Sequence, residues 1–277
     1  MDTIRLLFLT ILFRPYVFVF LVIYLYAAAR AIGPRKAVLF TLIAWAVAYI
    51  SEFSSVRNGF PFGLYYYIPS TKNKELWVMG VPFMDSLSFT FLSYSSWRTA
   101  RVFLPCEKKF SWKIILLGAF LMTLLDVVID PLALRGDRWF LGKIYYYPHP
   151  GPYFGVTIEN FAGWFFVGAL TMRIWKAVDG PRVAKGAQGA EGLPCADTSN
   201  KINSLNPKPS GRADLLGPAL YFIVLFFNLF MTFRIGEITL GITGVFLFLP
   251  VTALFAAKVR NLMVFEKNFQ GGRGCFR

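Results

Sequence analysis

The chain has 277 residues, of which 56% are apolar, 18% are aromatic and only 16% are charged. Soluble domains carry about 25% charged residues, so this composition excludes a soluble globular protein and an intrinsically disordered one. The 29 basic residues outnumber the 15 acidic ones, but they lie in short segments between apolar runs. That pattern is typical of the topology signal of a membrane protein and argues against a nucleic-acid partner.

Seven apolar stretches are long enough to cross ~30 Å of hydrocarbon as helices. They are residues 15–29, 37–53, 79–97, 112–131, 155–175, 215–233 and 238–257. The predicted fold class is therefore all-α, a polytopic membrane bundle of about seven transmembrane helices. Residues 1–14 are predicted to form an interfacial helix, since Arg14 would be costly inside the bilayer. A signal peptide cleaved near Ala29 is the alternative.

The domain organisation follows from these spans. Residues 15–178 form a five-span core, and residues 179–213, rich in Gly, Pro and Ser, form a flexible linker. A two-span block covers residues 214–257, and a basic tail of residues 258–277 lies against lipid headgroups.

The basic residues also predict the orientation. One side of the membrane receives 20 of the 29 and should be cytoplasmic. This predicts that the N-terminus lies outside and the C-terminus inside; the expected location is the inner membrane of a bacterial or archaeal cell. Cys106, Cys195 and Cys275 all fall on the cytoplasmic side, where thiols stay reduced, so no disulfide is expected.

Six acidic residues lie at span ends that all reach the outer face. They are Glu52, Asp85, Asp126, Asp130, Glu159 and Glu237. Acids at this depth are costly and mark candidate functional sites, although pairing with arginines at the headgroups would also explain them. Asp126 and Asp130 are four residues apart and therefore share one helix face.

An internal duplication connects these acids. Glu52 precedes Gly63, the triplet Tyr65–Tyr67, Gly80-Val and then Asp85; Asp130 precedes Gly142, the triplet Tyr145–Tyr147, Gly155-Val and then Asn160. Both copies run helix, outer loop, helix, which predicts a parallel repeat with a ligand site between its halves.

Five separated motifs carry a family resemblance. They are Glu52 with the segment 59–67, Gly80-Val-Pro82, Asp126 with Asp130-Pro131, Trp139 to Tyr147, and Gly155 to Trp164. This set resembles the carotenoid biosynthesis membrane proteins that include bisanhydrobacterioruberin hydratase and carotenoid 1,2-hydratases. The second copy departs from the pattern at Thr157, where a proline is expected after Gly155-Val156.

The resemblance implies addition of water to the terminal double bond of an acyclic carotenoid, giving a tertiary alcohol without a cofactor or metal. Such hydration needs a proton donor, a cation-stabilising surface and a positioned water. We predict two sets of site residues: catalytic Glu52, Asp85, Asp126, Asp130 and Asn160, and substrate-binding Tyr65, Tyr66, Pro82, Trp139, Tyr146, Glu159 and Trp164. The expected partners are a polyene in the bilayer, membrane lipid and other carotenoid enzymes.

Three other functions are compatible with the residues. A carotenoid cyclase would also protonate a polyene with acids but would close a ring instead of admitting water. A membrane prenyltransferase could hold magnesium diphosphate with Asp126 and Asp130, but the second aspartate-rich motif is missing. A non-enzymatic transporter or lipid-binding protein could use the same repeat and cavity.

Overall fold

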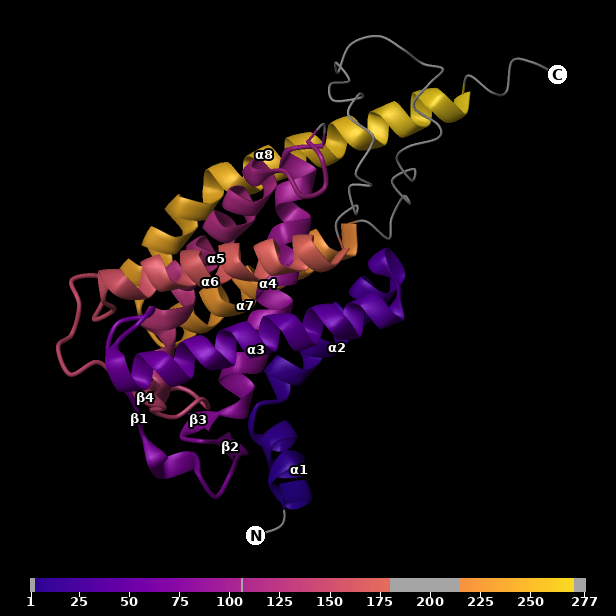
Figure 1. The fold of residues 1–277 in the computed structure, drawn as a ribbon. Coiled ribbons are helices and arrows are strands. Elements are labelled where there is room, and N and C mark those ends of the chain that lie inside the picture. Colours follow the sequence, from indigo (N-terminus) through magenta and orange to yellow (C-terminus); the bar gives the residue numbers. More distant parts are fainter. Residues whose placement is uncertain (1–2, 106, 180–214, 272–277) are drawn as a thin grey trace.

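The computed structural model describes residues 3–105, 107–179 and 215–271. The predicted linker after Asp179, the three cysteines and the end of the basic tail lie outside these ranges. Within them the helices are α1 (Thr3–Phe13), α2 (Pro15–Ile32), α3 (Pro34–Asn58), α4 (Phe83–Phe103), α5 (Trp112–Ala133), α6 (Ile158–Asp179), α7 (Leu216–Arg234) and α8 (Ile238–Gly271). The chain is a helical bundle of the kind expected for a membrane protein (Figure 1).

The helix ends follow local sequence signals. Pro15 and Pro34 occupy the first turns of α2 and α3, where the missing N–H costs no hydrogen bond. Helix α3 ends at Gly59, whose φ of +81° is left-handed and whose N–H donates to the Ser55 carbonyl over 3.0 Å. Ser111 caps α5 by accepting from the Ile114 N–H.

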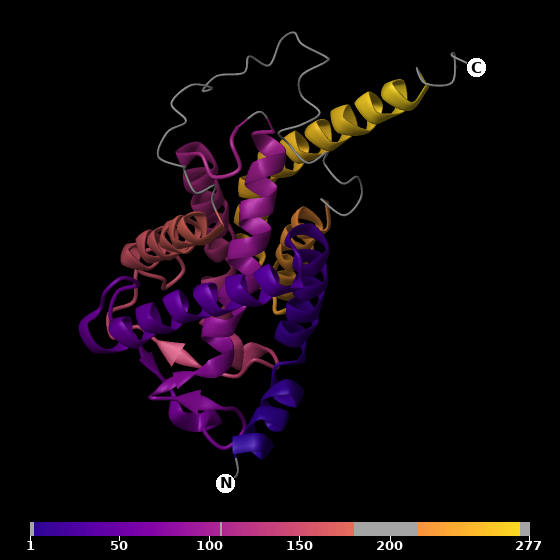
Figure 2. The same cartoon turned by 45° about the vertical axis from the view of Figure 1, so that its right-hand side comes forward.

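Helix α4 is the central element of the bundle. It packs against α2, α3, α5 and α7, which surround it in both views (Figures 1 and 2), and it is buried along most of its length. Most of its serines and threonines find partners inside the protein: Thr99, for example, donates to the Ser95 carbonyl over 2.8 Å. Because protein and not lipid surrounds α4, it tolerates many polar side chains.

Five described helices are long and apolar enough to cross a membrane: α2, α3, α5, α7 and α8. Helices α4 and α6, at 21 and 22 residues, match the predicted spans in length but are less apolar. α4 is rich in Ser and Thr, and α6 carries Glu159, Arg173 and Lys176. The prediction of seven spans therefore remains a prediction for these two helices.

The connections α3–α4 and α5–α6 lie at one end of the bundle, together with α1 (Figures 1 and 2). They contain the short strands β1 (Tyr66–Tyr67), β2 (Trp77–Val78), β3 (Val81–Pro82) and β4 (Tyr145–Tyr146), and the 3-10 turns η1 (Pro69–Thr71) and η2 (Gly136–Arg138). β1 pairs with β4, and β2 with β3, both antiparallel. The first pair joins the two loops that the sequence predicts to be repeated.

The two loops share an unusual turn. Met79 and Phe154 have φ angles of +47° and +51°, and each precedes a glycine, Gly80 or Gly155, at +91°. Positive φ is uncommon for a residue with a side chain, so the same pair in both loops means that the chain enters α4 and α6 through similar turns. The parallel repeat of whole helices remains a prediction.

Candidate active site

A cavity of about 140 Å³ lies where the helices meet the two loops. Side chains from α2, α3, α4, α5, α6 and α7 line it, together with residues of both loops. Most of its wall is apolar and aromatic; Phe20, Phe62, Phe89 and Phe91 are examples. The polar side chains of the wall include carboxyl groups, asparagines, tyrosines and Arg14.

Three carboxyl groups on three different helices face this cavity: Glu52 near the end of α3, Asp85 in the first turn of α4, and Asp130 near the end of α5. Glu52 is buried and accepts a hydrogen bond from the Ser86 hydroxyl. The structure thus brings together three of the residues predicted to be catalytic.

Asp126 lies behind the cavity wall. It is fully buried, and its Oδ2 accepts a hydrogen bond of 2.7 Å from Nδ2 of Asn160, while its Oδ1 has no partner among the described residues. Asn160 itself lines the cavity. One turn of α5 separates Asp126 from Asp130, so the two aspartates are neighbours on the same face of the helix.

The paired strands β1 and β4 cover the cavity with tyrosines. Tyr66 is opposite Tyr146, and both are partly exposed, at 41% and 44%. Neighbouring residues of a strand point to opposite faces, and the tyrosines on the other face line the cavity: Tyr65, Tyr67, Tyr145 and Tyr147. The rings of Tyr65 and Tyr145 meet edge to face, with centroids 5.6 Å apart.

The cavity tyrosines remain hydrogen-bond donors. Burial and the nearby Glu52 carboxylate raise the pKa of Tyr65 and Tyr67 well above the ordinary tyrosine value. Burial and the Asp130 carboxylate do the same to the pKa of Tyr145. Their hydroxyls therefore stay protonated at any physiological pH and can donate to the carboxylates or to a bound oxygen.

The other residues predicted to bind substrate divide into two groups. Trp139 and Trp164 line the cavity, and Trp164 stacks on Phe89 with centroids 4.4 Å apart. Pro82 is buried in β3 and Glu159 is exposed at the start of α6; neither belongs to the cavity lining, and nor do Tyr66 and Tyr146.

A family model described as carotenoid biosynthesis protein matches residues 10–199, well over half of the chain. The chain belongs to this carotenoid biosynthesis family. The matched range contains every acid and tyrosine of the cavity and ends before α7. Comparisons with curated proteins and with solved structures found no match.

This member of the carotenoid biosynthesis family also has a buried ion pair at the site. The Arg14 guanidinium donates from Nε and Nη2 to the two oxygens of Glu75, over 3.1 and 3.0 Å, and from Nη1 to the Leu141 carbonyl over 3.0 Å. Arg14 lines the cavity, and the two side chains are 1% and 0% exposed. Nearby, the Leu76 N–H donates to the Thr10 hydroxyl over 2.8 Å, so α1 is attached to the α3–α4 loop.

The sequence does not predict this pair. It predicts Arg14 at the end of an interfacial helix, although an arginine between two apolar segments is itself a signal of an internal partner. Glu75 is the only acid in the α3–α4 loop, and that was the second signal. The two residues are 61 positions apart in the sequence, so local spacing does not predict their contact.

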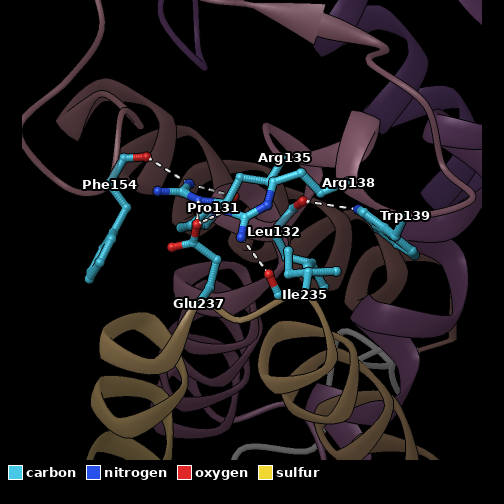
Figure 3. A network of polar contacts seen from close by, with 8 residues as sticks. All are labelled: Pro131, Leu132, Arg135, Arg138, Trp139, Phe154, Ile235 and Glu237. Carbon is cyan, nitrogen blue, oxygen red and sulfur yellow. Dashed lines mark hydrogen bonds and ion pairs between the residues drawn. The ribbon is translucent and has the colours of Figure 1, made fainter.

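Glu237 does not join the other acids. It lies in the α7–α8 turn and pairs with Arg135, at 3.0 Å, and with Arg138 (Figure 3). Arg138 also donates to the Ile235 carbonyl, and Arg135 donates to the carbonyls of Pro131 and Phe154 over 2.8 and 3.1 Å. These contacts attach the α7–α8 hairpin to the end of α5 and to the second loop.

No group of three or more His, Cys, Asp and Glu side chains within the described ranges is arranged to hold a metal ion. The polar groups that line the cavity are carboxyl groups, tyrosine and serine hydroxyls, asparagine amides and the Arg14 guanidinium.

Proposed function

We propose that this protein adds water to the terminal double bond of an acyclic carotenoid, giving a tertiary alcohol. The observation that carries the proposal is the meeting of Glu52, Asp85 and Asp130 in one cavity whose wall is mostly aromatic and aliphatic, in a chain of the carotenoid biosynthesis family. Hydrocarbon lining suits a polyene end, and carboxyl groups suit its protonation.

The reaction requires one proton to be transferred from the protein to the alkene and another to be transferred from the water to the protein. A carboxyl group gives its proton to the CH carbon of the terminal double bond, and the two alkene electrons form the new C–H bond. The other carbon becomes a tertiary cation. A water oxygen bonds to that carbon, and the extra proton of the water goes to a carboxylate of the cavity, so that the sum is alkene plus water.

Aromatic rings would stabilise the cation. Trp164, Trp139 and Tyr65 belong to the cavity lining, and a cation over an aromatic face is attracted by the ring quadrupole. An apolar wall also keeps bulk water out, so that only a bound water reaches the cation.

The remaining polar groups have supporting roles in this proposal. Asn160 orients Asp126 through the bond of 2.7 Å, and Asp126 in turn lies beside Asp130 as the second carboxyl of a pair. Tyr67 lines the same cavity as Glu52 and Asp85, and its hydroxyl favours the charged forms of both carboxyl groups. Oriented donors of this kind set which carboxyl gives the proton and which receives it.

The cavity takes one end of the substrate, and the rest of the polyene stays in the bilayer. We further propose that the protein spans the inner membrane of a bacterial or archaeal cell, with the cavity in the outer half of the bilayer. A substrate and a product that stay in the membrane favour association with the enzymes that precede and follow this step.

The test is expression of the full chain in a host that makes lycopene, followed by pigment mass analysis. The proposal expects a product heavier by one water, with heavy oxygen in the alcohol when the water is labelled and one deuterium on the adjacent carbon when the medium is deuterated. A product of unchanged mass with a new ring would make the protein a cyclase. Oxygen taken from dioxygen would overturn the proposal.

A further inference from the structure

Helix α7 lies beyond the part of the chain that matches the family, yet two of its residues, Val224 and Asn228, line the cavity. Between Leu216 and Phe233, Asn228 is the only residue whose side chain carries an amide or a charge. A polar side chain in an apolar span, turned toward the protein interior, is a candidate for substrate contact.

A hydrogen bond fixes the orientation of the Asn228 side-chain amide. Its Nδ2 donates to the Val224 carbonyl over 2.9 Å, and because a carbonyl only accepts, the other side-chain atom must be the oxygen. Asn228 is 8% exposed, and none of the described residues donates to its Oδ1. A hydrogen-bond acceptor without a protein partner is thus available at the cavity wall.

The position of Asn228 is held from both ends of α7. The Tyr221 hydroxyl, two turns earlier, donates to the Leu121 carbonyl of α5 over 2.9 Å. At the other end, Glu237 pairs with Arg135 and Arg138 (Figure 3). Next to Asn228, the Phe227 ring stacks on Tyr16 with centroids 5.2 Å apart.

Asn228 reaches the cavity from a helix outside the predicted repeat. Helix α7 packs on α2, α4 and α5; Asp85 and Asp130 come from α4 and α5, and Glu52 and Asn160 come from α3 and α6. A polyene end held in the cavity would therefore meet Asn228 as well as the carboxyl groups.

We propose that Asn228 is a catalytic residue that holds the attacking water by accepting a hydrogen bond from it at Oδ1. This inference rests on the proposed hydration. The water donates one hydrogen to Oδ1, its oxygen bonds to the tertiary cation, and its other proton passes to a carboxylate. Without the held water, the cation loses a proton from a neighbouring carbon and becomes an alkene again.

The experiment compares wild type, Asn228→Leu and Asn228→Gln in deuterated medium, with Thr232→Val as the matched control. Thr232 lies one turn further along α7, is buried, and is not part of the cavity lining. Two products are measured by mass: the alcohol, and the recovered polyene that carries deuterium. The second reports protonation that was not followed by water capture.

We expect Asn228→Leu to lower the ratio of alcohol to deuterated polyene by about tenfold or more, since a buried hydrogen bond to the reacting water is lost. Asn228→Gln keeps an oxygen acceptor and should restore part of the ratio, and Thr232→Val should keep the wild-type ratio. If Asn228→Leu does not fold, Asn228→Ala is measured with the same expectation.

A merely structural role would lower both products together and leave their ratio unchanged, and that result would overturn the inference while the proposed function stands. A wild-type protein that forms no alcohol would overturn the proposed function, and this inference with it. The wild-type and variant measurements thus separate the two failures.

Discussion

Tyr66 is opposite Tyr146 across the β1–β4 pair, with ring centroids 5.9 Å apart, at the point where the two loops of the site meet. In the sequence these residues are the middle members of the two tyrosine triplets. The pairing turns both middle rings outward and the flanking tyrosines inward. One strand pair therefore divides six similar residues into a cavity-lining set and an outer set.

This division predicts different effects of two similar substitutions. Tyr67→Phe removes a hydroxyl from the cavity that favours the charged forms of Glu52 and Asp85, and we expect about tenfold less product because that stabilisation is lost. Tyr66→Phe removes a hydroxyl from the outer face and should cost less. Pigment yield at equal protein level in membranes is the measurement. A larger effect of Tyr66→Phe would mean that the outer face contacts the substrate.

The carboxyl groups should be indispensable. Glu52→Gln or Asp130→Asn replaces an acid by an isosteric amide that cannot give a proton, so activity should fall by about 10²–10⁴ while the protein still folds and binds pigment. Asp137→Asn, at an exposed acid of η2, is the control. Full activity in both Glu52→Gln and Asp130→Asn would remove these residues from the mechanism.

The Asp126–Asn160 contact should appear as an energetic coupling. Asn160→Ala leaves a buried carboxyl group without its donor, so the effects of Asn160→Ala and Asp126→Ala on the free energy of unfolding in detergent should not add. A double-mutant cycle is expected to give a coupling of about 0.5–3 kcal/mol. Additive effects would show that the bond contributes nothing to stability.

Replacing one member of the Arg14–Glu75 pair should lower the free energy of unfolding more than replacing both members. Arg14→Met alone leaves a buried glutamate without its partner and should lower the free energy of unfolding by about 3–5 kcal/mol. Arg14→Met combined with Glu75→Met should be closer to wild type. Lys113→Met, which breaks the exposed pair with Glu107, is the control and should change little. A double variant less stable than either single one would contradict this account.

The predicted orientation can be tested with single cysteines in a background that lacks the three natural ones. Asn73 is exposed in the α3–α4 loop and Lys113 is exposed at the opposite end of the bundle. In intact cells an impermeant thiol reagent should label Asn73→Cys and spare Lys113→Cys. The reverse pattern would invert the topology.

The sequence by itself determined that this is a membrane helical bundle and which residue types meet at one end of it. Apolar runs and helix lengths are local properties, because a residue in hydrocarbon must satisfy its backbone within its own helix. Counting the spans gives their alternating direction. The alternation in turn predicts that the acids at span ends and the two tyrosine triplets lie at the same face of the membrane.

Only the tertiary structure decided which of these residues face the cavity. The four-residue spacing of Asp126 and Asp130 places them on one helix face, but the packing of α5 against α6 exposes Asp130 to the cavity and covers Asp126 with Asn160. Strand pairing between the loops selected the inner tyrosines, and Arg14 met Glu75 across 61 residues. Asn228 of α7 lines the cavity, although α7 contains no motif that predicts it. The rotation of a helix and the partner of a distant side chain depend on how all the elements pack together, and residue spacing along one element does not contain that information.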